Sequence, residues 1–173
     1  MEHEPETQLL KDRTFAADTR GFLILGVGNT LLTDEGIGVH VVSSLARDLA
    51  DRDDLTFLDG GTLSFTLAAP VADSAGLIVV DTAQLHAAPG TVRLFEGPEM
   101  DTFLATGPKT SVHEVSLGEV LAMTLAQDAL PARRVLIGIQ PASLDWGMEP
   151  TPEVAAAIPE AKALVHRILK EWT

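Results

Sequence analysis

Residues 22–38 read FLILGVGNTLLTDEGIG, a stretch in which a short apolar run gives way to glycines and then to two acids. A continuous apolar run between loop signals is typical of a strand that is buried on both faces of a parallel sheet. From Asp34 to Leu49 the apolar residues recur at helical spacing, with Thr33 or Asp34 as the expected N-cap. The stretch therefore predicts a strand, a loop and a helix in succession.

Four further stretches predict strands. Three are short apolar runs, and the fourth follows a Pro-Gly turn and is expected to be an antiparallel edge strand. The runs are residues 55–58, 76–81 and 133–139, and the edge strand is residues 91–95. Acids stand at two strand ends, since Asp59 follows the first of these runs and Asp81 closes the second.

Helical patterns separate the predicted strands. They cover residues 34–49, 62–71, 112–127 and 152–172, and Pro159 can restart the last one as a first-turn residue. Alternating strands and helices form right-handed βαβ units. We therefore expect an α/β fold with three layers: a largely parallel, twisted sheet of about five strands with helices on both faces.

The composition indicates one domain and limits its chemistry. The chain has 173 residues, of which 46% are hydrophobic, enough for one buried core. We expect a single α/β domain over residues 21–173, preceded by a flexible N-terminal tail, residues 1–20. Cysteine is absent, which excludes a thiol nucleophile, a disulfide framework and a zinc–thiolate site. Any metal must be held by His, Asp or Glu.

The charge of the chain limits its partners. The net charge of −13 argues against binding to nucleic acid or to an anionic membrane. The excess acid is explained by solubility alone, or by docking of a basic protein surface or a metal cation. No apolar run reaches the length of a membrane span, and residues 1–20 lack the basic start and apolar core of a signal peptide. We therefore expect a cytoplasmic protein.

Polar residues follow several of the predicted strands. They are Asn29–Glu35, Asp59, Asp81 and Gln140–Asp145, and His113 lies near the start of a predicted helix. Parallel strands deliver their carboxyl ends to the same edge of the sheet, where ligands bind. Several carboxylates with one imidazole and no lysine in those loops suit a cation better than an anion.

The glycines also suggest a dinucleotide site, but the details disagree. Gly26-Val27-Gly28 resembles the start of a dinucleotide fingerprint, yet Leu31 stands where the third glycine belongs. Asp34 and Glu35 would place two negative charges where a pyrophosphate needs the positive end of a helix. A nucleotide site is therefore disfavoured.

Each candidate residue also has a structural interpretation. Glu35 can serve only to compensate a helix dipole, and His113 can be a capping or packing residue. Asp59 can stabilise a tight turn before Gly60-Gly61. Asp81 ends an apolar strand, so its half-buried carboxylate needs a partner. His86, in the loop after Asp81, is expected to be exposed and is the competing metal ligand.

Several motifs together resemble the hydrogenase maturation endopeptidase family. The resemblance covers residues 21–172 in the order of the family. Its longest motif is the opening GVGNTLLTDEGIG at residues 26–38. The shorter motifs are DGGT at 59–62, VVD at 79–81, APGT at 88–91, SVH at 111–113, and GIQP at 138–141 with Ser143-Leu144.

The resemblance implies a function and a metal-binding triad. Glu35, Asp81 and His113 would contact nickel that is carried by the substrate, and a surrogate divalent cation can occupy the same place. The substrate would be the precursor of a [NiFe]-hydrogenase large subunit, from which the protease removes the C-terminal extension after nickel insertion. A non-catalytic nickel-binding chaperone for hydrogenase assembly is the alternative.

The hydrolytic mechanism stays open at this point. The metal could orient the scissile peptide, polarise its carbonyl or activate a water, with Glu35 and Asp81 serving both as ligands and in hydrolysis. Alternatively Asp59 could act as a general base. We further expect Gly28, Asn29 and Gly36 to bind substrate. At the two glycines, the missing side chain allows close backbone approach.

Overall fold

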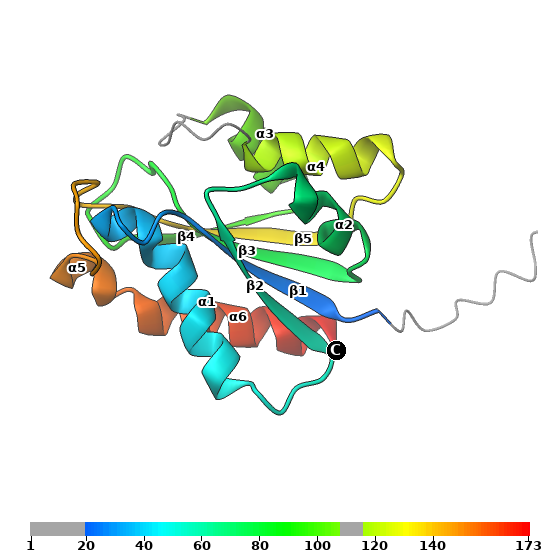
Figure 1. Cartoon of the computed structure of the whole chain (residues 1–173), viewed down its shortest axis with the longest axis horizontal. Coiled ribbons are helices and arrows are strands. Elements are labelled where there is room, and N and C mark those ends of the chain that lie inside the picture. The colour runs from blue at the N-terminus through cyan, green and yellow to red at the C-terminus, as the bar shows by residue number, and fades with distance from the viewer. Residues whose placement is uncertain (1–19, 108–115) are drawn as a thin grey trace, which may run out of the picture.

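The computed structural model describes residues 20–107 and 116–173, and it contains the predicted five-stranded sheet (Figure 1). The strands are β1 (Phe22–Val27), β2 (Leu55–Gly61), β3 (Gly76–Thr82), β4 (Val92–Glu96) and β5 (Arg133–Ile139). Their order across the sheet is β2-β1-β3-β5-β4, and only the β4–β5 pair is antiparallel. The prediction of a largely parallel sheet with an antiparallel edge strand is confirmed.

The helices form a layer on each side of the sheet, as Figure 1 shows. They are α1 (Ile37–Asp48), α2 (Ala68–Ala72), α3 (Pro98–Thr106), α4 (Leu117–Ala126), α5 (Pro152–Ala155) and α6 (Ile158–Trp172). One core cluster joins α1, α5 and α6 to one face of the sheet, and a second joins α2, α3 and α4 to the other. The central strands bury residues on both faces, which explains their continuous apolar runs.

The register of the strands puts their carboxyl ends on one side of the molecule. Gly26 of β1 is paired with Asp59 of β2 on one side and with Val80 of β3 on the other. Asp81 is in turn paired with Gly138 of β5. The loops after these four strands therefore meet at one edge of the sheet, at the left of Figure 1. We call it the carboxyl edge, and the other end the amino edge.

The helix after β1 begins differently from the prediction. A 3₁₀ turn, η1 (Thr33–Gly36), comes first, and the α-helix starts only at Ile37. Neither element has a side-chain N-cap, so the expectation that Thr33 or Asp34 caps the helix is wrong. The Asp34 carboxylate instead accepts hydrogen bonds from a distant loop, as described below.

Other helix boundaries also shift. The predicted helix over 62–71 is a short 3₁₀ turn, η2 (Phe65–Leu67), followed by α2, which runs through Pro70. The predicted last helix is divided into α5 and α6, and Pro159 lies in the first turn of α6 as expected. Helix α4 begins at Leu117 behind a capping box formed by Ser116 and Glu119, while the start predicted at 112 lies outside the described residues.

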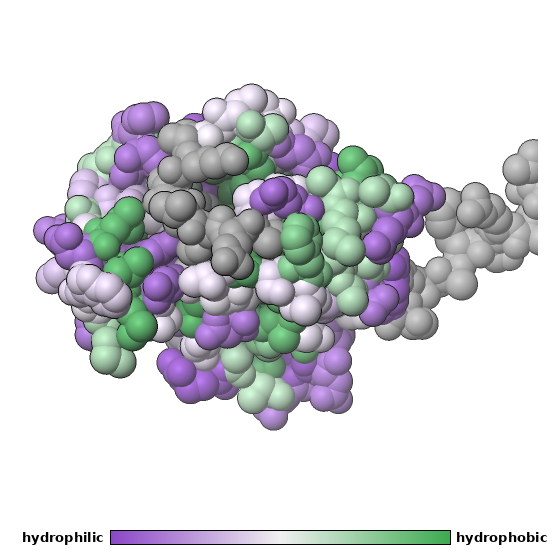
Figure 2. All heavy atoms as spheres, turned by 45° about the horizontal axis from the view of Figure 1, so that its top comes forward, coloured by the Kyte–Doolittle hydropathy of each residue, from purple (hydrophilic) through white to green (hydrophobic). Residues whose placement is uncertain are grey.

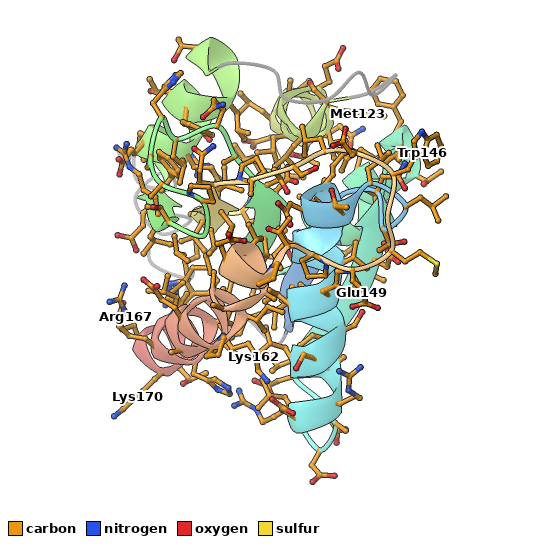
Figure 3. The ribbon with its side chains drawn as sticks, turned by 90° about the vertical axis from the view of Figure 1, so that its left-hand side faces the viewer. Met123, Trp146, Glu149, Lys162, Arg167 and Lys170 are labelled. Atoms are coloured by element: carbon orange, nitrogen blue, oxygen red, sulfur yellow. The ribbon has the colours of Figure 1, made fainter. Side chains whose placement is uncertain are left out.

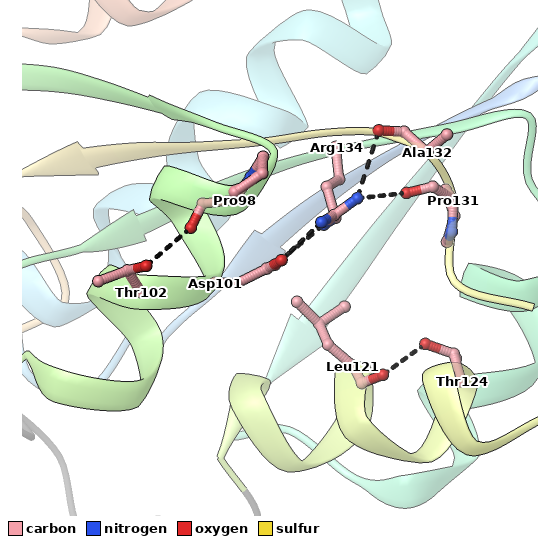
Figure 4. Close-up of polar contacts among 8 residues, drawn as sticks. All are labelled: Pro98, Asp101, Thr102, Leu121, Thr124, Pro131, Ala132 and Arg134. Carbon is pink, nitrogen blue, oxygen red and sulfur yellow. Dashed lines mark hydrogen bonds and ion pairs between the residues drawn. The ribbon is translucent and has the colours of Figure 1, made fainter.

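Helix α3 was not predicted, although the sequence carries its start signals. Pro98 stands in its first turn together with two acids, Glu99 and Asp101, but only Met100 is fully buried, so the apolar periodicity is weak. A tertiary contact fixes the helix. Arg134 of β5 donates to both carboxylate oxygens of Asp101, at 2.9 and 2.5 Å (Figure 4).

No helix in residues 20–107 and 116–173 combines the length and the apolar character that a membrane span needs.

Candidate metal and peptidase site

Glu35 and Asp81 come together at the carboxyl edge. Glu35 lies in η1 and is 6% exposed, and Asp81 is the second-last residue of β3 and directly follows its apolar run. The Asp81 residue keeps some exposed surface, but its carboxyl group is buried. Burial and, to a smaller extent, the nearby negative charge of Glu35 raise the pKa of Asp81 to about 7. The charge of Glu35 thus acts on Asp81, so the two carboxyl groups lie in the same part of the carboxyl edge.

Close packing of the chain around η1 places Glu35 above β3. The Thr82 hydroxyl donates to the Asp34 carbonyl at 2.7 Å, which ties η1 to the end of β3. At Gly38, a Cβ atom would lie 2.1 Å from the Val80 carbonyl oxygen and 2.5 Å from that of Val27. Only glycine allows this approach. The first turn of α1 is therefore pressed onto β1 and β3, and Glu35, two residues before that helix, lies near the end of β3.

Asp34 is the anchor of this edge, a role that the sequence did not reveal. Its side chain is fully buried and accepts backbone N–H groups of Ala142 (2.8 Å), Ser143 (2.9 Å) and Thr151 (2.6 Å). The Thr151 hydroxyl adds a contact at 3.0 Å. Hydrogen bonds from N–H groups to a carboxylate are charge-assisted and stronger than those to a neutral acceptor. Asp34 thus fixes both ends of the loop 141–151 to η1.

Two glycines serve the packing of the same loop. Gly28 has a φ of +133°, and a Cβ atom there would lie 1.7 Å from the carbonyl oxygen of Glu35. At Gly36, a Cβ atom would lie 2.8 Å from the Cα of Thr30. The close approach that the sequence predicted for a substrate is made at both positions by the chain itself. The fold alone requires glycine here.

The structure gives Asn29 and Asp59 local roles. The Asn29 carboxamide oxygen accepts the N–H of Leu31 at 2.9 Å, and Asp59 accepts the N–H of Gly61 at 2.8 Å. The turn interpretation of Asp59 is therefore confirmed. Its neighbour Leu58 packs with the α2–α4 cluster, so alternation along β2 points Asp59 toward the α1–α6 face.

Asp81 points the other way, because Val79, two residues before it, packs with the α2–α4 cluster. The register also puts one strand between Asp59 and Asp81, a spacing of roughly 10 Å. The structure therefore does not bring Asp59 to the two carboxylates.

Of the two histidines predicted as metal ligands, only His86 lies within the described residues. His86 is exposed, as expected, and its N–H donates to the Gln84 side chain at 3.1 Å. His113 lies outside the described residues. Within the described ranges, no group of three or more His, Asp and Glu side chains is arranged to hold a metal ion. Of the three predicted ligands, the structure brings Glu35 and Asp81 to the same edge, and their role as metal ligands stays a prediction.

Comparison with known proteins identifies the family. A family model described as hydrogenase maturation protease matches residues 39–169. The chain belongs to the hydrogenase maturation protease family. It is 37% identical over 151 residues to the hydrogenase expression/formation protein HupD of Rhizobium leguminosarum bv. viciae, and this alignment covers 87% of this chain and 74% of that protein. It is 35% identical over 150 residues to the hydrogenase 2 maturation protease of Escherichia coli, covering 86% and 90% of the two chains.

Solved structures agree with this assignment. The hydrogenase maturating endopeptidase HybD of E. coli superposes with a TM-score of 0.78 at 34% identity, covering 87% of this chain and 93% of HybD. A [NiFe]-hydrogenase maturation protease from Thermococcus kodakarensis gives a TM-score of 0.69 at 28% identity, with coverages of 86% and 98%. This member of the family is accordingly a peptidase, which removes the support for a non-catalytic chaperone.

Proposed function

We propose that the protein removes the C-terminal extension of a [NiFe]-hydrogenase large-subunit precursor after nickel insertion, and that it recognises the nickel held by that substrate. The observation that carries the proposal is the pair formed by Glu35 and Asp81 at the carboxyl edge. Burial and, to a smaller extent, the negative charge of Glu35 raise the pKa of Asp81 to about 7. A cation between the two carboxylates would offset that negative charge.

The ligand chemistry of the pair fits a nickel ion that is only partly coordinated by the protease. Carboxylate oxygens bind divalent cations, and imidazole is a common nickel ligand, so His113 is the proposed third ligand. Three protein ligands leave positions for groups of the substrate. The free protease is therefore expected to bind nickel weakly, and a surrogate divalent cation can take the same place.

The substrate-borne nickel would position the scissile peptide. Glu35 is rigidly placed by η1 and Asp81 by β3, so a nickel ion that contacts both is held in one orientation relative to the sheet. A peptide bond close to that ion is then presented in a fixed geometry, which lowers the entropic part of the barrier. Precursor without nickel lacks this anchor and would not be cut.

The test is a mass-shift assay on purified precursors with and without nickel. Glu35→Gln keeps the size and shape of the side chain but removes its charge. Its matched control is Glu160→Gln, because Glu160 is an exposed acid in the first turn of α6. If Glu35 only compensates a helix dipole, both variants lose a few tenths of a kcal/mol of stability and keep cleavage.

We expect cleavage of nickel-loaded precursor by the wild-type protein and by Glu160→Gln, and a large loss in Glu35→Gln. Equal cleavage of nickel-free and nickel-loaded precursor would contradict the role of nickel. Calorimetry that showed tight, saturable nickel binding by the free protein would instead favour a metal carried by the protease.

A further inference from the structure

The loop 141–151 carries apolar side chains that face solvent. Of the seven large hydrophobic residues exposed in the described part of the chain, three lie in this loop and a fourth lies in the loop before η1. They are Trp146 at 82% exposed, Met148 at 69%, Leu31 at 49% and Leu144 at 39%. Single exposed apolar side chains are ordinary, but a group of them marks an interaction surface. We call these four residues the apolar rim.

Backbone pairing joins the two segments of the apolar rim. Gly147 donates its N–H to the Leu31 carbonyl at 2.9 Å, and Thr33 donates its N–H to the Gly147 carbonyl at 2.7 Å. Leu32 and Gly147 form a parallel bridge. Leu31 therefore lies beside residues 146–148. Figure 3 looks onto the carboxyl edge and shows Trp146 at the outer bend of the loop, and Figure 2 shows hydrophobic residues among hydrophilic ones at the same end of the molecule.

The apolar rim and the acidic pair belong to one rigid unit. Asp34 binds the loop at Ala142, Ser143 and Thr151, and it is directly followed by Glu35. The Thr33 hydroxyl adds a hydrogen bond to the Ser143 carbonyl at 2.8 Å. A surface that is already ordered loses little entropy when a partner docks on it. A partner seated on the rim is thus held at a fixed position relative to Glu35.

The two segments that form the apolar rim carry charge of one sign. Residues 26–38 and 140–151 contain four acids and no lysine, arginine or histidine. Asp145 and Glu149 are exposed within the loop itself. A matching surface would carry apolar side chains for Trp146 and Met148, with lysine or arginine around them.

We infer that the apolar rim is the docking surface for the folded hydrogenase large-subunit precursor, separate from the contact made by the nickel; this rests on the function proposed above. An apolar patch of the precursor, bordered by basic residues, packs on Trp146 and Met148. That contact brings the nickel and the scissile bond to Glu35 and Asp81. Exposed tryptophan is a frequent source of binding energy when it becomes buried in an interface.

Fluorine NMR can observe this docking without any cleavage. The chain contains two tryptophans, so protein labelled with 5-fluorotryptophan gives two signals. Trp172 packs against Phe22 at the amino edge and serves as the internal control. On addition of unlabelled precursor without nickel, the Trp146 signal should shift or broaden while the Trp172 signal stays in place. The inference would be overturned if neither signal changed, or if only the Trp172 signal changed.

Kinetics on nickel-loaded precursor provide the second test. Trp146→Ala and Met148→Ala should raise KM about tenfold or more each and leave kcat and the melting temperature near the wild-type values, since both side chains are exposed. Trp146→Phe should restore part of the loss. Leu125→Ala is the control, because Leu125 is 62% exposed but lies on α4. Wild-type KM in both rim variants would overturn the inference.

The two proposals fail in different ways. If no precursor is ever cut but the Trp146 signal still responds to precursor, the docking surface stands and the proposed cleavage falls. If precursor is cut and neither the Trp146 signal nor the KM of Trp146→Ala changes, the cleavage stands and the docking surface falls.

Discussion

Acidic side chains have opposite environments at the two edges of the sheet. At the amino edge two acids are paired with cations: Arg134 makes a bidentate contact with Asp101, and Arg52 does the same with Asp54. These contacts hold the pKa of Asp54 below its usual range and raise that of Arg134. At the carboxyl edge, burial and a neighbouring acid raise the pKa of Asp81 to about 7.

The contrast distinguishes the carboxyl edge by the charge state of its side chains and not by the shape of the surface. The amino edge has a hollow of about 850 Å³ that is lined by Arg20, Asp54, Arg133 and Trp172 among others. Asp54 is already paired there with Arg52, and Arg133 donates to the Trp172 carbonyl at 2.7 Å. Asp81 instead gains from binding either a proton or a cation, which agrees with the metal site proposed above.

Asp81→Asn tests the contrast most directly. The change keeps the shape of the side chain but removes an anionic ligand, so cleavage of nickel-loaded precursor should fall at least about 100-fold. Asp101→Asn is the matched change at the amino edge. It should keep wild-type cleavage but lower the melting temperature by roughly 2–4 °C, because it weakens an ion pair worth about 1 kcal/mol. Wild-type cleavage by Asp81→Asn would remove Asp81 from the site.

Asp34→Asn should have the next largest effect, this time on stability. The amide keeps one acceptor oxygen but turns an N–H donor toward backbone donors of Ala142, Ser143 or Thr151. Leaving buried donors unsatisfied should cost about 3 kcal/mol, measured by urea denaturation. Asp145→Asn in the same loop is exposed and should stay within about 0.5 kcal/mol of wild type. A stability loss that is equal in both variants would show that Asp34 is not the anchor.

Gly36→Val separates packing from substrate binding. A Cβ atom at this position would lie 2.8 Å from the Thr30 Cα, so we expect a stability loss of about 1–3 kcal/mol and a proportionate loss of cleavage. Melting temperature and processing rate should be measured on the same preparation. A strong loss of cleavage at an unchanged melting temperature would support a direct contact between Gly36 and substrate.

The pKa of Asp81 predicts a pH dependence of the metal-free protein. Its carboxyl has a pKa of about 7 in the folded state and about 3.9 in the unfolded state, so the folded state holds more protons between these values. The contribution of this group to stability is therefore greatest at low pH and declines as the pH rises from about 4 to about 7. Asp81→Asn should gain melting temperature over the wild type as the pH is raised from about 5 to about 8. A difference in melting temperature between the two proteins that does not change with pH would contradict the raised pKa of Asp81.

Asp59→Asn should have the smallest effect. The amide can keep the acceptor for the Gly61 N–H, and Asp59 lies on the other face of the sheet from Asp81. Cleavage should change less than about twofold, and stability by less than about 0.5 kcal/mol. A loss of cleavage comparable to that of Asp81→Asn would return Asp59 to the reaction as a general base.

The sequence determined the sheet, because strand signals are local. The apolar runs that form β1, β3 and β5 lie between two helical layers, and burial on both faces demands continuous hydrophobic residues. The acids at the strand ends followed from parallel topology, so Glu35 and Asp81 could be placed at one edge without coordinates. The family assignment followed from the same motifs. The role of His113 and the part played by nickel stay predictions.

Only the tertiary structure decided which acid does what, because that depends on contacts between residues far apart in the chain. Asp34 and Glu35 are neighbours with the same charge, yet Asp34 accepts N–H groups of residues 142–151, while the charge of Glu35 contributes to the raised pKa of Asp81. Helix α3 likewise depends on Arg134, and Gly28 and Gly36 on backbone atoms that pack against them. Such contacts form only when the loops after separate strands meet at one edge, and no local pattern encodes that meeting.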